Sequence, residues 1–258
     1  MNLLEAIFLG IIQGLAEFLP VSSSGHLMVF HHLLRIESND NLTFIVVLNL
    51  GTLIPLLYIF RKDILELVRR PFQKTVLLLI IATIPIVIAT LTFENFVETL
   101  FQSTQFLAFG FLATGIILIL TDKIKGNKKT LKDMTYTDSI TVGLTQALAI
   151  FPGLSRSGST LSALLLRGIT REDAVKFSFL MSIPAAFGAL GFRILRMFTG
   201  HIDVSQLNFL NLFAGFIAAM ISGYLSINLM MKLIKTAKLK YFALFYVFGL
   251  TALIFVLF

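Results

Sequence analysis

Long stretches without a single Asp, Glu, Lys or Arg constrain this chain more than any other feature of its sequence. A transmembrane helix needs about 20 mostly apolar residues, and stretches of this kind recur along the chain. They cover residues 41–60, 75–93, 99–121, 204–231 and 241–258, and a shorter one, 177–192, continues with further apolar residues. The sequence therefore predicts an all-α polytopic membrane protein with six transmembrane helices.

The composition supports a membrane location. Hydrophobic residues make up 57% of the 258 residues and charged residues only 14%, whereas soluble domains have about 45–50% and about 25%. This excludes a soluble domain, a disordered chain and a nucleic-acid-binding domain, so we expect no nucleic-acid partner despite the net charge of +7. The absence of cysteine excludes disulfides, thiolate metal sites and thiol nucleophiles.

Two further apolar stretches are interrupted by polar turns. Residues 3–34 are broken by Glu17, Pro20 and three consecutive serines, and residues 139–166 by Pro152-Gly153 and Ser155-Arg156-Ser157-Gly158. Each stretch predicts two helices of about ten residues, which rise only about 15 Å, half of the hydrocarbon thickness. We expect two re-entrant helix–turn–helix hairpins, because irregular backbone at that depth needs protein or a watery cavity around it.

The basic residues predict how the chain crosses the membrane. Segments 61–74, 122–137, 167–176 and 232–240 contain 17 of the 21 Lys and Arg residues. Basic loops favour the cytoplasmic side, and all four segments can lie there only if each hairpin returns to the side it entered. The first hairpin then opens outward and the second inward.

The two hairpins also resemble each other in sequence. Residues 10–27 align without gaps over residues 143–160, at an offset of 133, and eight of the 18 positions are identical. Each half, 1–125 and 134–258, then contains one hairpin and three spans, so the second half is inverted relative to the first. Chance similarity of two Gly/Ser-rich turns is the alternative. Inverted repeats with broken helices place a site near the midplane, between the halves.

The first hairpin contains a carboxylate where a charge is costly. Glu17 is therefore a functional-site candidate, although it could instead pair with a nearby cation. Gln13 lies one helical turn earlier on the same face, and oxygens of this kind suit Mg²⁺ or Ca²⁺. Gln13 and Glu17 are thus the candidate metal ligands.

Hydroxyl groups and one histidine follow the break in the first hairpin. Ser22, Ser23 and Ser24 precede a helix, and hydroxyls with backbone N–H groups at such a position suit an anion. His26 titrates near neutrality and could act in acid–base chemistry. The alternative is a helix-capping run with an interfacial histidine.

The second hairpin contributes an arginine among small polar residues. The planar guanidinium of Arg156 can bind phosphate oxygens in a bidentate manner, with Ser155, Ser157 and Thr160 as further candidate substrate contacts. Arg156 could also serve as the structural counter-ion of Glu17. Since the repeat should bring both hairpin tips to one site, the two roles are compatible, and the combined residues indicate a phosphorylated substrate.

At these motifs the chain resembles the bacterial undecaprenyl-diphosphate phosphatase family of the bacitracin-resistance type. The resemblance rests on EAIFLGIIQGLAEFLPVSSSGHL (5–27), PGLSRSGST (152–160) and FSFLMSIP (177–184). It implies a multi-pass plasma-membrane enzyme that hydrolyses undecaprenyl diphosphate to undecaprenyl phosphate and inorganic phosphate, recycling the lipid carrier for cell-wall synthesis. It also implies an outward-facing site and a need for Mg²⁺ or Ca²⁺.

The family's functional residues fall on Gln13, Glu17, Ser22, Ser23, His26 and Arg156 of this sequence. We expect Arg156 to clamp the diphosphate and Glu17, with Gln13, to hold the metal or orient the nucleophile. The preferred nucleophile is Ser23 with His26 as its base; a phospho-His26 intermediate and a metal-activated water remain alternatives. The rival function is a secondary transporter or flippase of a phosphorylated lipid. The sequence leaves the oligomeric state open, a homodimer included.

Overall fold

The computed structural model describes residues 1–34, 36, 41–101, 104–124, 127–198, 208–236 and 238–246, and these residues form helices without any multi-residue strand. The α-helices are α1 (Leu3–Phe18), α2 (Ser23–Leu33), α3 (Asn41–Ile59), α4 (Arg61–Arg69), α5 (Lys74–Phe101), α6 (Thr104–Thr121), α7 (Tyr136–Leu148), α8 (Arg156–Leu166), α9 (Arg171–Phe198) and α10 (Phe209–Thr236). Short 3₁₀ turns lie at Leu131–Asp133, between α6 and α7, and at Leu239–Tyr241, after α10.

Within the described residues, three helices are long and apolar enough to cross a membrane. They are the Lys74–Phe93 part of α5, Arg171–Phe192 of α9 and Phe209–Lys235 of α10. A fourth candidate joins α3 to α4 through a bend of 77°. These spans make the chain a polytopic membrane protein.

The helix bounds correct several details of the sequence prediction. Helix α6 begins at Thr104 rather than at residue 99, and α9 extends the short run 177–192 to 28 residues. The charged segment after residue 60 forms the helix α4. Its Arg61 guanidinium lies 4.5 Å from the centre of the Tyr58 ring, and its Asp63 forms an ion pair with Lys176. Most of the predicted span 241–258 lies outside the described residues.

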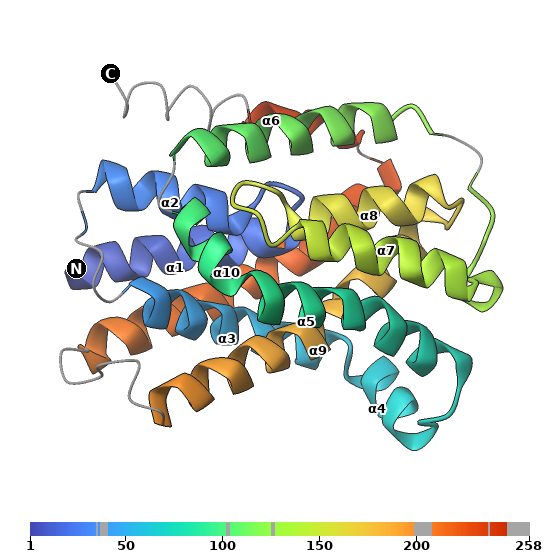
Figure 1. Cartoon of the computed structure of the whole chain (residues 1–258), viewed down its shortest axis with the longest axis horizontal. Coiled ribbons are helices and arrows are strands. Elements are labelled where there is room, and N and C mark those ends of the chain that lie inside the picture. Colours follow the sequence, from blue (N-terminus) through green and yellow to red (C-terminus); the bar gives the residue numbers. More distant parts are fainter. Residues whose placement is uncertain are drawn as a thin grey trace.

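Two helix pairs occupy the positions of the predicted hairpins. In Figure 1, α1 and α2 lie in the left half and α7 and α8 in the right half, and their connecting turns meet in the middle. The first helix of each pair is longer than the predicted ten residues, with 16 in α1 and 13 in α7. A side-chain cap at Asn2 and one at Thr135 start these two helices, since both accept the otherwise unpaired N–H groups of the first turn.

The offset of 133 found in the sequence recurs in the helix bounds. Helices α7 and α8 begin 133 residues after α1 and α2, at Tyr136 and Arg156. Their N-caps repeat as well: Ser22 accepts a hydrogen bond from the Gly25 N–H, and Ser155 accepts one from the Gly158 N–H. Equivalent residues therefore begin equivalent helices in the two hairpins.

The close contacts between helices of opposite halves also recur at the offset of 133 residues. Helix α1 packs along α10, and α7 packs along α5. A Cβ at Gly10 would collide with the Gly215 carbonyl, and one at Gly143 with the Ala82 carbonyl. Gly10 and Gly143 are 133 residues apart, as are Ala82 and Gly215. Each hairpin thus packs closely on a long helix of the opposite half.

Candidate active site

A pocket of about 440 Å³ lies where the two hairpin turns meet. Its two charged residues and most of its serines come from the end of α1 and from the turns and first residues that begin α2 and α8, and its other walls, which are mainly apolar, come from α3, α5 and α9. Several lining residues form pairs at the offset of 133, among them Ser22 with Ser155 and Asn49 with Ser182. The pocket therefore lies between the equivalent parts of the two halves.

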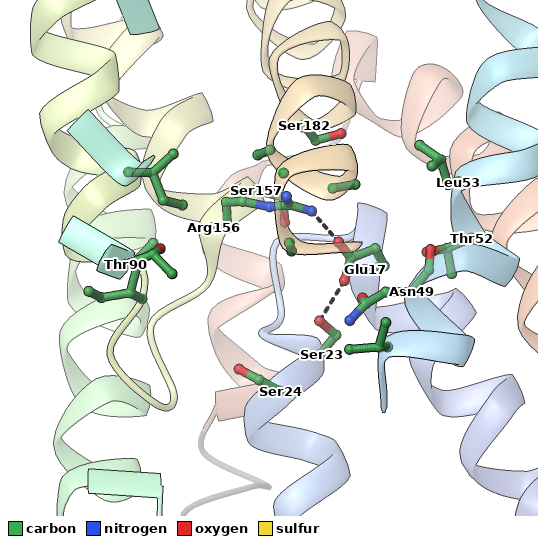
Figure 2. A pocket seen from close by; sticks show the side chains of 18 of the residues that line it. Glu17, Ser23, Ser24, Asn49, Thr52, Leu53, Thr90, Arg156, Ser157 and Ser182 are labelled. Atoms are coloured by element: carbon green, nitrogen blue, oxygen red, sulfur yellow. Dashed lines mark hydrogen bonds and ion pairs between the residues drawn. The ribbon is translucent and has the colours of Figure 1, made fainter. Parts of the chain in front are cut away.

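Glu17 is the centre of the polar network in this pocket (Figure 2). One of its carboxylate oxygens forms an ion pair with the Arg156 guanidinium. The other oxygen accepts hydrogen bonds from the Ser23 hydroxyl at 2.7 Å and from the Gln13 side-chain amide at 3.0 Å. The ion pair balances the two charges, so a carboxylate can persist in a largely apolar environment.

The backbone of the turns fixes these side chains. Ser22 has φ of +66°, the one positive φ among the described non-glycine residues. Such a conformation costs of order 1–3 kcal/mol and persists where surrounding contacts enforce it. The Ser157 hydroxyl donates to the Leu19 carbonyl at 3.0 Å, which joins the second turn to the first. Arg156 is thereby held opposite Glu17.

Seven of the residues singled out in the sequence line the pocket, and Gln13 adjoins it. Those seven are Glu17, Ser22, Ser23, Ser24, Ser155, Arg156 and Ser157. Gln13 is buried and reaches the site through its hydrogen bond to Glu17.

His26 and Thr160 lie outside the pocket lining. The His26 ring packs on Phe111 at 5.3 Å between centroids, and its Nδ1 lies 2.8 Å from the Ser22 carbonyl. Its Nε2 is buried, with no hydrogen-bond partner among the described residues. The buried Thr160 hydroxyl bonds instead to the Arg156 carbonyl at 2.8 Å and to Ser178. The structure therefore joins Ser23 to Glu17 by a hydrogen bond and does not join it to His26.

Asn49 of α3 belongs to the site although the sequence reasoning did not select it. Its side-chain oxygen accepts a hydrogen bond of 2.7 Å from Gln13, and the residue lines the pocket beside Glu17 (Figure 2). A side-chain amide inside a charge-free transmembrane run was the available signal, because polar residues at that depth usually have a partner.

The donor set suits a hard cation only with help from a substrate. No group of three or more His, Cys, Asp or Glu gathers anywhere in the part of the chain that the structure describes. Glu17 is the single carboxylate of the pocket lining, with the Ser23 hydroxyl and the side-chain amides of Gln13 and Asn49 nearby. Mg²⁺ is often bound by one or two carboxylates together with substrate phosphates, so these residues fit a metal that the substrate shares.

Comparison with known proteins gives a consistent result over nearly the whole chain. Residues 6–253 match the family described as bacitracin resistance protein BacA. An undecaprenyl-diphosphatase of Carboxydothermus hydrogenoformans is 41% identical, over 98% of this chain and 97% of its own length. Undecaprenyl-diphosphatase 3 of Bacillus cereus is also 41% identical, over 100% and 98%. An undecaprenyl-diphosphatase of Halothermothrix orenii is 42% identical, over 94% and 93%.

Proposed function

The chain belongs to the bacitracin resistance protein BacA family, and from this membership we propose that it is an undecaprenyl-diphosphatase. It hydrolyses undecaprenyl diphosphate to undecaprenyl phosphate and inorganic phosphate, and so recycles a lipid carrier for cell-wall synthesis. The names of its relatives support hydrolysis and give no support to the rival function of transport.

The observation that carries this proposal is the contact between Glu17, Arg156 and Ser23 at one end of an apolar-walled pocket. A diphosphate entering the pocket competes with Glu17 for the Arg156 guanidinium, because planar guanidinium groups bind phosphate oxygens in a bidentate manner. When the Arg156 guanidinium binds the substrate phosphate instead, one oxygen of Glu17 loses its ion pair. The carboxylate can then accept a proton while Arg156 offsets the charge that develops on the transferred phosphoryl group.

Ser23 is the proposed nucleophile and Glu17 its base. The Ser23 oxygen attacks the terminal phosphorus, its proton passes to Glu17, and the bond to the bridging oxygen breaks, which releases undecaprenyl phosphate. Water then hydrolyses the phosphoserine and yields inorganic phosphate. The hydrogen bond of 2.7 Å between Ser23 and Glu17 supports this pairing. His26, buried against Phe111, then positions the first turn of α2.

Mg²⁺ or Ca²⁺ is the proposed cofactor. Glu17 would hold the ion together with Gln13, and the ion would neutralise charge on the diphosphate.

The proposed topology has six transmembrane helices and two re-entrant hairpins in an inverted repeat of residues 1–125 and 134–258. The protein would lie in the bacterial plasma membrane with its site open to the outside. The shared offset of helix starts and of glycine contacts supports the repeat, and the basic segments support the orientation.

Phosphate release by purified protein tests this function. We expect the wild type to release phosphate from undecaprenyl diphosphate, and EDTA to stop the release. Arg156→Ala should lower kcat by at least about 100-fold without changing the unfolding temperature much. Arg69→Ala, on the exposed α4, is the matched control and should retain activity. A folded wild type that releases no phosphate would contradict the assignment.

A further inference from the structure

The polar pocket continues into an apolar groove between α5 and α9. A second cavity of about 410 Å³ is lined by α5 from Val76 to Ile88 and by Pro184 of α9. Val87 lines both cavities, and the first cavity extends along α5 as far as Leu91. Together they follow α5 for about 22 Å, most of a hydrocarbon core of about 30 Å.

The groove offers nothing to a polar ligand. Its lining is aliphatic apart from Thr83, whose hydroxyl donates to the Leu79 carbonyl of its own helix at 2.7 Å. Ile80 and Ile88 are 51% and 59% exposed, which is far more than core residues of their type. Such a surface, continuous with a phosphate-binding site, suits a hydrocarbon chain attached to that phosphate.

Small residues of α9 line the first cavity directly after Pro184, the α9 residue that lines the second. Ala185, Ala186, Gly188 and Ala189 all line the first cavity. A Cβ at Gly188 would meet no atom within 4 Å, so the space beside it is empty rather than filled by a neighbouring helix. A larger side chain at this position would therefore narrow the lining of the first cavity without colliding with a neighbouring helix.

We propose that the groove between α5 and α9 binds the polyprenyl tail of the substrate, and that Gly188 admits the tail into it. This inference rests on the proposed function, since it takes the substrate to be a prenyl diphosphate. The diphosphate lies at Arg156 and the tail leaves along α5 toward Val76. The groove thus favours long-chain over short-chain prenyl diphosphates.

Substitution at Gly188 tests the groove through chain length. We compare Gly188→Leu with wild type on undecaprenyl diphosphate and on farnesyl diphosphate, whose tail is much shorter. The variant should lose about tenfold or more in kcat/KM for the long substrate and change little for the short one. Gly191→Leu is the matched control, because a Cβ there also meets nothing within 4 Å while Gly191 lines neither cavity. Equal effects on both substrates, or none, would overturn the proposal.

A binding measurement separates failure of the groove from failure of the function. A prenyl diphosphate with a photoreactive group near the end of its tail is cross-linked to the wild type, and labelled peptides are mapped by mass spectrometry. Adducts should fall on residues 76–88 of α5. Adducts confined to other helices would overturn the tail assignment even for an active enzyme. Adducts on α5 in a protein without phosphatase activity would uphold the groove and contradict hydrolysis.

Discussion

At the scale of single residues, the site depends on how one carboxylate is shared. Glu17 accepts from Ser23 and Gln13 and pairs with Arg156, so each partner limits the directions in which the carboxylate can turn. Asn49 completes this arrangement from α3 by accepting the second hydrogen of the Gln13 amide. We regard Asn49 as a positioning residue, since it acts on Glu17 through Gln13.

Removal of the Asn49 amide should therefore weaken catalysis more than substrate binding. We expect Asn49→Ala to lower kcat about tenfold, the equivalent of one lost hydrogen bond, with KM changed much less. Ser182→Ala is the control, because Ser182 lies at the equivalent position of α9 and lines the pocket while its hydroxyl bonds to the Phe179 carbonyl. An unchanged kcat in Asn49→Ala would show that Gln13 and Glu17 keep their positions without the help of Asn49.

At the scale of elements, an ion cluster joins three parts of the chain: the segment before α7, the first turn of α7 and the end of α8. Asp138, with a fully buried side chain, pairs with Lys129 at 3.1 Å and with Arg167 at 2.6 Å. The Thr135 N–H and hydroxyl donate to it at 2.8 Å each. Burial alone would raise the pKa of the Asp138 carboxyl, but these hydrogen bonds and cations lower it well below its usual range.

This lowered pKa predicts how stability depends on pH. A carboxyl group whose pKa is lower in the folded than in the unfolded state stabilises the folded protein. This contribution is complete at pH values above the unfolded pKa, about 3.9 for Asp, and it is lost as the pH falls below that value. Asp138→Asn should therefore cost about 3 kcal/mol near neutrality, and the difference from wild type should narrow below about pH 4.

Thermal unfolding in detergent at pH 7, 5 and 3 measures this difference. Asp133→Asn is the control, since Asp133 caps the preceding turn from an exposed position and should matter far less. A difference between Asp138→Asn and wild type that stays constant from pH 7 to pH 3 would refute the role of the charge.

At the scale of the whole molecule, the sequence predicts what recurs and misses what depends on packing. The breaks at Ser22 and Ser155 are visible in the sequence because serine is a preferred N-cap residue, and each of these serines caps the helix that follows it. The sequence does not predict that α4 is helical, because its charged residues are also typical of a loop. The ion pair of Asp63 with Lys176 is visible only in the structure. The hydrogen bond from Ser23 to Glu17 and the packing of His26 on Phe111 depend on rotamers and burial, which no residue spacing encodes.

The proposed inverted repeat makes a prediction about the two faces of the membrane. If the hairpins enter from opposite sides, the end of α2 faces outward and the start of α7 faces the cytoplasm. Leu34 and Tyr136 mark these ends and are exposed, and the chain contains no cysteine, so single cysteines can report their location. Leu34→Cys should react with a membrane-impermeant maleimide in spheroplasts, and Tyr136→Cys only in inverted vesicles. Lys128→Cys, in a basic segment, is the cytoplasmic control. Reaction of Leu34→Cys and Tyr136→Cys from the same side would rule out the inverted arrangement, because one hairpin would then have to cross the membrane or both would enter together.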